Sequence, residues 1–259
     1  MRVVAVHADV IVFISRVWQT TCTAVRAGEE GFVIDSPVYP DELEALPGVL
    51  ERAGFPVSGL LITHADWDHL LGRLAFAQAS LGCAESSAAR LQAEPGGAQR
   101  SLRDFDAEHY VDGRRPLALA GVQSVPVPGR LELGTECELE LHPTAGHTAD
   151  GTAYWMPWTG VLVCGDYLSP VEIPMISEGG SPEAYLVTLE RLGALVEGAE
   201  TIVPGHGAPL RRADARRVLD EDVAYLEALR ASGPTAELPR GRSTPTQREI
   251  HGRNAARLT

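Results

Sequence analysis

Residues 60–72 read LLITHADWDHLLG, and this short stretch decides how the rest of the chain is interpreted. An apolar run is followed at once by four side chains that carry nitrogen or oxygen donors: His64, Asp66, Asp68 and His69. On a loop, alternate residues can point the same way, so this spacing can aim several metal ligands into one small volume. Charged groups crowded in this way repel one another unless a cation neutralises them. The stretch therefore predicts a metal site where a strand ends and a helix begins.

A potential ligand follows the end of an apolar run at three later places in the chain. The run ELELH leads to His147, the run GVLVC leads to Asp166, and the run ETIV leads to His206. Glycine or proline stands beside each of these ligands, and such residues let the backbone turn sharply. Rigid strands that end in functional loops are where enzymes place their chemistry. We therefore expect these side chains to meet the first four at a common edge.

Taken together, these segments resemble the metallo-β-lactamase fold hydrolases. The signature of that family is THxHxDH, followed by Gly-His, a strand-terminal Asp and a second Gly-His. The resemblance covers about residues 20–207, and all four pieces occur in the order of the family. The matching pieces here are THADWDH at 63–69, Gly146 with His147, Gly165 with Asp166, and Gly205 with His206.

The resemblance implies an α/β fold, the four-layer αββα sandwich, with a pair of metal ions at one edge of the sheets. It implies two divalent ions, with Asp68 also acting as a catalytic acid and base that orients the nucleophile and moves its proton. The implied ligands are His64, Asp66 and His147 for the first ion, Asp68, His69 and His206 for the second, and Asp166 as the bridge.

Asp66 departs from the family pattern, which usually has a histidine at that position. Three carboxylates, two divalent ions and a bridging hydroxide sum to a charge of about zero, whereas a histidine would leave about plus one. A more neutral cluster is a weaker Lewis acid, and oxygen ligands favour harder ions. Zinc is expected from the family, with manganese or iron as alternatives. Asp66 could instead cap the helix or hydrogen-bond the loop.

The expected activity is hydrolysis by a dinuclear metal centre, in which a bridging hydroxide attacks an electrophilic carbon or phosphorus. We favour an ester, thioester or lactone of a small metabolite as the substrate, with a phosphodiester as an alternative. A rival interpretation is a diiron redox protein, because diiron members of the same fold also carry a carboxylate at the position of Asp66. A degenerate binding module without catalysis is a third interpretation.

The amino-acid composition indicates which classes of binding partner to expect. The 259 residues include 35 acidic and 22 basic residues, all of the latter arginine, and the net charge is −13. Such a chain has no overall attraction for nucleic acid or for anionic membranes. No apolar stretch approaches the ~20 residues of a membrane span, and no secretory pattern forms at the N-terminus. We therefore predict a cytoplasmic protein with a small-molecule substrate, and its assembly as a homo-oligomer stays open.

The chain divides into a hydrolase domain at 1–231 and an Arg-rich tail at 232–259, flexible or docked. A polar helical insertion at 86–116 interrupts the domain and is expected to act as the lid that selects the substrate. Short β-branched runs predict strands at 3–6, 10–14, 21–25, 32–35, 59–63, 138–142, 160–166 and 200–205. Helical spacing predicts helices at 41–53, 69–81, 182–196 and 213–231.

Several other residues have more ordinary interpretations. Asp35 ends a strand and is expected to brace the metal-binding loop from behind. Trp67 either lines the pocket or packs beneath the loop, and His109 in the insertion could reach over the site. The four cysteines are far apart and form no CxxC pair, so we expect reduced and mostly buried thiols. Cys164 among them is expected to be a buried strand residue rather than a nucleophile.

Overall fold

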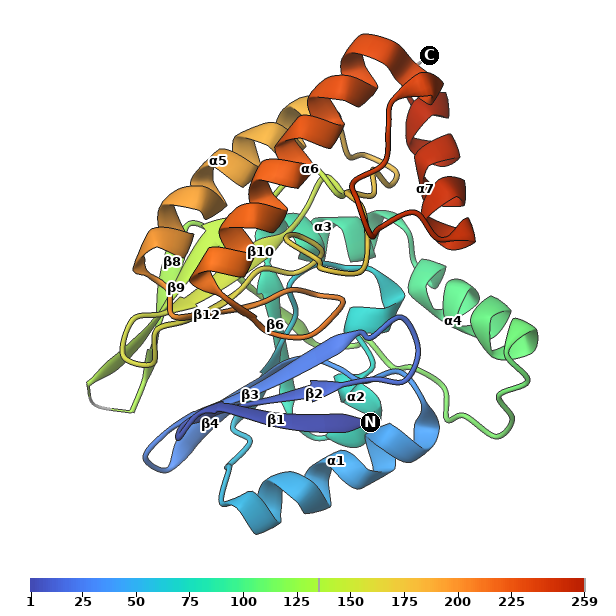
Figure 1. Cartoon of the computed structure of the whole chain (residues 1–259). Helices are drawn as coiled ribbons and strands as arrows, with labels where there is room; N and C mark the ends of the chain where they lie inside the picture. Colours follow the sequence, from blue (N-terminus) through green and yellow to red (C-terminus); the bar gives the residue numbers. More distant parts are fainter. Residues whose placement is uncertain (135, 259) are drawn as a thin grey trace.

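The computed structural model of the protein describes residues 1–134 and 136–258. Two β-sheets lie face to face, and helices cover the outer surface of each (Figure 1). Within the described residues the first sheet has seven strands in chain order, antiparallel from β1 to β4 and parallel from β4 to β7. Its strands are β1 (Arg2–His7), β2 (Val10–Ile14), β3 (Thr21–Ala27), β4 (Glu30–Asp35), β5 (Gly59–Leu61), β6 (Ser80–Ala84) and β7 (Val122–Val125).

The second sheet has six strands in the described part of the chain, in the order β13, β12, β11, β10, β9 and β8. Only the β11–β12 pair is parallel there, and the other described neighbours are antiparallel. Its strands are β8 (Gly129–Leu133), β9 (Cys137–Pro143), β10 (Thr152–Met156), β11 (Val161–Val163), β12 (Thr201–Val203) and β13 (Leu210–Arg211).

Helices complete the outer layers. The first sheet packs against α1 (Pro40–Ala53) and the short α2 (Gly72–Ala75), and the second packs against α5 (Pro182–Gly198) and α6 (Arg212–Ser232). A third cluster of buried apolar side chains, which includes Ile34, fills the space between the two sheets. This arrangement of helix, sheet, sheet and helix confirms the predicted αββα sandwich.

Local sequence explains why α1 begins and ends where it does. Pro40 occupies the first helical position, where a missing N–H costs nothing, and Glu42 accepts a hydrogen bond from the backbone N–H of Tyr39. Gly54 ends the helix in the left-handed conformation, with φ of 69°. That conformation is common for glycine because it has no Cβ. The predicted helix at 41–53 is therefore confirmed, with its predicted stop.

The predicted helix at 69–81 is wrong over most of its length. The chain there forms a single 3₁₀ turn, η1 (Trp67–His69), then α2, and from Ser80 the strand β6. Leu81, Gly82 and Cys83 are buried between the parallel strands β5 and β7. A strand covered on both faces reads as a continuous apolar run, which periodicity cannot distinguish from a buried helix.

The insertion between β6 and β7 contains two helices, α3 (Glu85–Ala93) and α4 (Gly97–Glu108). In Figure 1, α3 lies close to the loops at the centre of the molecule, and α4 extends from it towards the outside. α4 contacts η1, the turn that carries part of the predicted metal site. The insertion therefore lies beside the predicted site.

The C-terminal tail is docked on the second half of the fold. It forms the short turn η2 (Gly233–Thr235) and the helix α7 (Pro245–Ala256). Before α7, Arg242 is only 2% exposed and pairs with buried Asp222 at 2.6 Å. Its guanidinium also donates to the backbone carbonyl of Glu172 at 2.8 Å. The tail is thus part of the folded domain.

Helix α7 holds the loop at 169–176 through its polar side chains. Gln247 accepts a hydrogen bond from the backbone N–H of Ile173 at 2.7 Å. Asn254 accepts one from Ile176 and donates one to the carbonyl of Pro174. These bonds replace the ladder partners that an irregular buried segment lacks. The position of the loop at 169–176 therefore depends on the tail.

The four cysteines are free thiols, three of them buried, which confirms the prediction. Burial raises the pKa of Cys164, so this thiol stays protonated and unreactive as expected. The two tryptophans of the YWMPW stretch pack against the cores, Trp155 on the helix side of the second sheet and Trp158 between the sheets. Among the described residues, no helix has the length and apolar character needed to cross a membrane.

Candidate metal centre

Strand order explains why the predicted ligands meet. β5 is parallel to β4 in the first sheet, and β11 is parallel to β12 in the second. The carboxyl ends of parallel strands lie at the same edge of a sheet. Backbone hydrogen bonds join the two edges, from Thr21 to Gly205 and from Thr152 to Thr63, both at 2.7 Å. The loops after β5, β9, β11 and β12 therefore converge between the sheets.

All seven predicted side chains lie together at this point. They form three overlapping groups, in each of which one ligand atom per residue lies within 4.8 Å of the others. Nitrogen and carboxylate oxygen donors in such groups are suited to a divalent cation. The groups are His64 with Asp66 and His147, His64 with His69 and Asp166, and Asp68 with His69 and His206.

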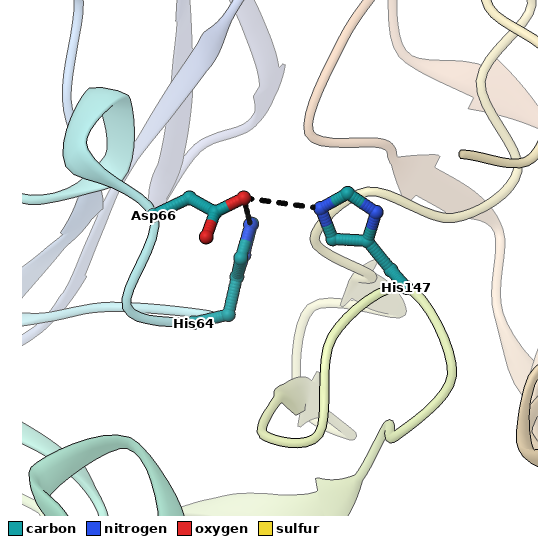
Figure 2. Close-up of side chains that lie close together, drawn as sticks. All are labelled: His64, Asp66 and His147. Atoms are coloured by element: carbon teal, nitrogen blue, oxygen red, sulfur yellow. Dashed lines mark hydrogen bonds and ion pairs between the residues drawn. The ribbon is translucent and has the colours of Figure 1, made fainter. Parts of the chain in front are cut away.

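The first group joins the loop after β5 to the loop after β9. Figure 2 shows His64 and Asp66 on one side and His147 approaching from the other, with one oxygen of Asp66 between the two rings. Oδ2 of Asp66 lies 3.5 Å from Nε2 of His64 and 3.3 Å from Nε2 of His147. One aspartate oxygen and two imidazole nitrogens therefore face the same point.

Asp166 lies at the centre of the cluster. Its Oδ2 is 3.4 Å from Nε2 of His147 and 3.3 Å from Nε2 of His206. Its Oδ1 is 3.2 Å from Nε2 of His69. The two oxygens thus face ligands of both outer groups, which is the position required of a bridging carboxylate.

The third group is more open. Oδ2 of Asp68 lies 3.7 Å from Nε2 of His69 and 3.8 Å from Nε2 of His206. Asp68 is 7% exposed and lies in the turn η1, while His206 follows β12 in the other sheet. These distances leave room for a cation between the three side chains, since metal–ligand bonds of ~2.0–2.2 Å separate ligand atoms by more than a hydrogen bond does.

Nδ1 of each of the four histidines faces an oxygen outside the cluster, through a hydrogen bond in three of them and an ion pair in His69. Nδ1 of His147 lies 2.8 Å from the carbonyl of Met175, and Nδ1 of His206 lies 3.1 Å from the carbonyl of Trp18. A carbonyl only accepts, so Nδ1 carries the proton in these rings and Nε2 is left for a metal. His69 faces the Asp35 carboxylate at 3.0 Å, and His64 faces the Thr63 hydroxyl at 3.1 Å.

Asp35 braces the metal-binding loop, as predicted. Its carboxylate accepts hydrogen bonds from the backbone N–H of Thr63 at 2.7 Å and from the hydroxyl of Thr63 at 2.9 Å. The backbone of Asp35 is in the left-handed region, with φ of 59°, which aspartate tolerates better than most residues. The same carboxylate orients His69, a second function that the sequence did not indicate.

The buried atoms of the cluster fit a metal. Within residues 1–134 and 136–258, no hydrogen-bond partner reaches Nε2 of His64, Nε2 of His69 or Oδ1 of Asp166, although all three are shielded from solvent. An isolated buried polar atom costs about 1–3 kcal/mol. A cation at the centre of the cluster would satisfy all three atoms at once. The donor set of four imidazoles and three carboxylates suits zinc, manganese or iron.

Two comparisons with known sequences bear on these observations. The sequence model of the Metallo-beta-lactamase superfamily matches residues 15–206, which is more than half of the chain and includes all seven side chains of the cluster. The chain belongs to the metallo-beta-lactamase superfamily. No curated protein sequence matches it significantly.

Solved structures of metallo-beta-lactamase proteins share the fold. A family protein from Thermus thermophilus, TTHA1429, has a TM-score of 0.69 and 20% identity, with 88% of this chain and 82% of that chain covered. A metallo-beta-lactamase from Pontibacter korlensis has a TM-score of 0.61 and 17% identity, covering 85% and 97%. TTHA1623 in a di-iron-bound form has a TM-score of 0.63 and 22% identity, covering 80% and 97%.

Membership in the superfamily, together with the histidine and aspartate cluster, supports a metal-dependent hydrolase. The likeness to the solved structures, all below 25% identity, concerns the fold. The metallo-beta-lactamase fold thus accounts for the position of the cluster, and the substrate must be inferred from the residues around it.

Sequence reasoning missed two residues behind the metallo-beta-lactamase site. Arg90 of α3 pairs with Asp66 and with Asp150, and Asp150 also accepts a hydrogen bond from the backbone N–H of Ala65 at 2.9 Å. Asp150 is 2% exposed, so its charge is buried together with these partners. The one available signal was the position of Asp150 in HTADGT, three residues after His147 and just before a strand.

An aromatic wall lies beside the cluster, formed by Trp18, Trp67, Phe105 and His109. Trp67 and Phe105 are 4.8 Å apart between ring centroids, and Trp18 lies 5.3 Å from Phe105. Trp18 is 41% exposed, although its own backbone carbonyl faces His206. His109 stacks on Phe105 at 4.1 Å. Trp67 therefore joins an aromatic surface, and His109 lies at its outer end.

Metal uptake is expected to release protons. Burial lowers the pKa of His147, but Asp66 and Asp166 raise it more, to about 9. Burial also lowers the pKa of His206, while Glu172 and Asp166 raise it to about 10. Both rings are therefore protonated at pH 8 in the metal-free protein, whereas a metal needs them neutral. Calorimetric titration with zinc at pH 8 in two buffers of different ionisation enthalpy should show release of at least one proton per chain.

The same shifts set the stability of the metal-free protein. The folded pKa values lie above the unfolded value of ~6.5, so the charged histidines stabilise the fold fully below pH ~6.5. This contribution is lost as pH rises through about 9 and about 10.

The calorimetric titration can contradict the expected proton release. Equal heats of zinc binding in the two buffers would show that both histidines are already neutral in the metal-free protein at pH 8.

Proposed function

We propose that the protein is a dinuclear metal-dependent hydrolase that cleaves an ester, thioester or lactone of a small metabolite. The observation that carries this proposal is the convergence of seven nitrogen and oxygen donors, from four strand ends, around buried atoms without partners. When bound, two metal ions would supply a hydroxide nucleophile and polarise the bond to be cleaved.

The residues divide into two sets of ligands. His64, Asp66 and His147 would hold the first ion, because their Nε2 and Oδ2 atoms face one point. The second ion would lie among Asp68, His69 and His206. Asp166 contacts histidines of both sets, which favours it as the bridging ligand.

Asp68 is the residue suited to move a proton. Its Oδ2 lies 3.7 Å from Nε2 of His69 and 3.8 Å from Nε2 of His206, which leaves room for a nucleophile beside it. A carboxylate in this position can orient the nucleophile and pass its proton to the leaving group. We assign this catalytic function to Asp68.

The surroundings support an apolar acyl group in the substrate. Trp18, Trp67 and His109 keep part of their surface exposed around buried Phe105, and they offer aromatic surface close to the cluster. Phe105 and His109 belong to the insertion, which supports its proposed action as a substrate-selecting lid. The net charge of −13 favours a small molecule over a nucleic acid or another polyanion.

Two variants test this function. Asp68→Asn removes the proton-transferring carboxylate and is expected to lower kcat on ester and thioester substrates by about 10²–10⁴-fold. His206→Ala removes a ligand of the second ion and should lower activity at least as much. Asp214→Asn, an exposed carboxylate on α6, is the matched control and should keep the parent rate. Variants that stay folded and hydrolyse esters and phosphodiesters at the parent rate would refute the proposal, whereas activity on phosphodiesters alone would favour a phosphodiesterase.

A diiron redox protein is the second candidate, because one structural neighbour was solved in a di-iron-bound form. Elemental analysis of the purified protein separates the two. About two zinc or manganese ions per chain would favour the hydrolase. About two irons per chain, with visible absorption that bleaches on reduction, would favour redox chemistry.

A further inference from the structure

Arg90 lies directly behind the cluster and contacts one of its carboxylates. Its NH2 group donates to Oδ1 of Asp66 at 2.5 Å, and its NH1 group donates to Oδ1 of Asp150 at 2.9 Å. Arg90 is 33% exposed and belongs to α3, within the insertion. A helix outside the strand-end loops therefore reaches the metal-binding residues.

This contact divides the two oxygens of Asp66 between two partners. Oδ1 faces the guanidinium of Arg90, while Oδ2 faces Nε2 of His64 and Nε2 of His147. Figure 2 shows the same division, with one oxygen of Asp66 turned towards the two rings and the other away from them. An oxygen that accepts a charge-assisted hydrogen bond is a poorer ligand for an ion, because a cation must compete with the guanidinium for it.

Asp150 keeps the guanidinium in this position. Its Oδ2 accepts hydrogen bonds from the backbone N–H of Ala65 at 2.9 Å and from the hydroxyl of Ser87 at 2.7 Å. These two donors stabilise the buried charge of Asp150 besides Arg90. Asp150 therefore holds Arg90 through one NH group and leaves the other free to contact Asp66. The contact with Asp66 is the shorter of the two.

We propose that Arg90 is a positioning residue that restricts Asp66 to one coordinating oxygen and offsets its charge, and thereby favours zinc over manganese in the first metal position. This inference rests on the proposed dinuclear centre. Asp66 with Arg90 then presents one donor atom and a reduced negative charge, because the guanidinium is shared between Asp66 and Asp150. The sum of charges over the ligands alone omits this shared guanidinium and the buried carboxylate of Asp150.

The selectivity follows from coordination chemistry. Zinc in proteins prefers four ligands, while manganese accepts six ligands and favours carboxylate oxygen. Without Arg90, both oxygens of Asp66 are free to coordinate and the site carries an additional negative charge. Both changes favour the harder ion with the higher coordination number. Loss of a partner behind a ligand typically changes metal affinity by ~10–100-fold.

The test measures zinc and manganese affinities of the metal-free protein by competition with a chromophoric chelator. In Arg90→Gln we expect the ratio of zinc to manganese affinity to fall by ~10-fold or more. In Asp66→His, the guanidinium loses one of its two carboxylate acceptors and lies beside an imidazole and the bound cation, so both affinities should fall by ~10-fold or more. The double variant Asp66→His with Arg90→Gln removes the guanidinium beside the imidazole, and we expect its zinc affinity to recover to within ~3-fold of the parent value.

The ratio distinguishes positioning from structure, because a general loss of stability lowers both affinities together. Arg100→Gln, which breaks an exposed pair with Glu94 in the same insertion, is the matched control and should leave the ratio unchanged. An unchanged ratio in Arg90→Gln would overturn the proposal. A double variant that binds zinc no more tightly than Asp66→His alone would also contradict the proposal.

Arg90→Lys serves if the glutamine variant does not fold. Its single ammonium keeps the charge but cannot reach Asp66 and Asp150 with two separate groups, so we expect the ratio to fall. A ratio equal to that of the parent would overturn the proposal here too. Because these readouts measure binding, a protein that shows the shift but hydrolyses nothing would contradict the proposed function and not this inference.

Discussion

Asp166→Ala is expected to remove at least one metal ion per chain and to reduce hydrolysis to the background rate. Its two oxygens lie 3.2–3.8 Å from Nε2 of all four histidines of the cluster, so its loss affects both sets of ligands. Without it, His147 and His206 lose one of the carboxylates that offset the cost of burying their charged rings. The loss of metal affinity should exceed the ~10–100-fold that loss of an outer hydrogen-bond partner costs.

Metal content by elemental analysis, together with hydrolysis of an ester substrate, measures this effect. Asp41→Ala is the control. Asp41 is an exposed carboxylate that pairs with Arg16, and neither residue belongs to the cluster. A folded Asp166→Ala protein that keeps two metal ions and the parent rate would show that Asp166 is not the bridge.

Arg242→Ala is expected to be the most destabilising change outside the metal centre. Arg242 and Asp222 are 2% and 1% exposed, and their atoms lie 2.6 Å apart. Removal of the arginine leaves a buried carboxylate without its cation, which typically costs about 3–5 kcal/mol. The carbonyl groups of Ser169 and Glu172 lose a donor at the same time.

Chemical denaturation of the metal-free protein measures this change in the free energy of unfolding. The matched control is Arg216→Ala, whose exposed ion pair with Glu197 is worth about 0–1 kcal/mol. Equal effects of the two substitutions would mean that the tail contributes no more than a surface contact. The larger loss expected for Arg242 would show that the tail belongs to the stability of the domain.

A consequence of the docked tail reaches the metal centre. The loop at 169–176, which α7 holds through Gln247 and Asn254, carries the Met175 carbonyl that orients His147. The superfamily match ends at residue 206, before this helix begins. In this chain the orientation of His147 therefore depends on residues beyond the matched segment.

The sequence by itself predicted most strands and the members of the cluster, and its resemblance to a known family implied the sandwich. Short apolar runs bounded by glycine and proline predict strands well, because residue pattern and turn residues are local properties of a chain. The ligands are also local in sequence, since each follows soon after a strand. Glycine is required at two of these turns: a Cβ at Gly205 would overlap Asp166, and a Cβ at Gly146 would overlap the backbone of Tyr185.

Only the tertiary structure decided the features that depend on contacts between distant segments. The helix predicted at 69–81 became partly β6, because burial between two strands outweighed its helical spacing. The contact of Arg90 with Asp66 spans 24 positions, and that of Asn254 with Ile176 spans 78. Such partners leave no periodic pattern in a single sequence. They become visible only once the folded chain brings a charge or a hydrogen-bonding group next to a buried partner that needs one.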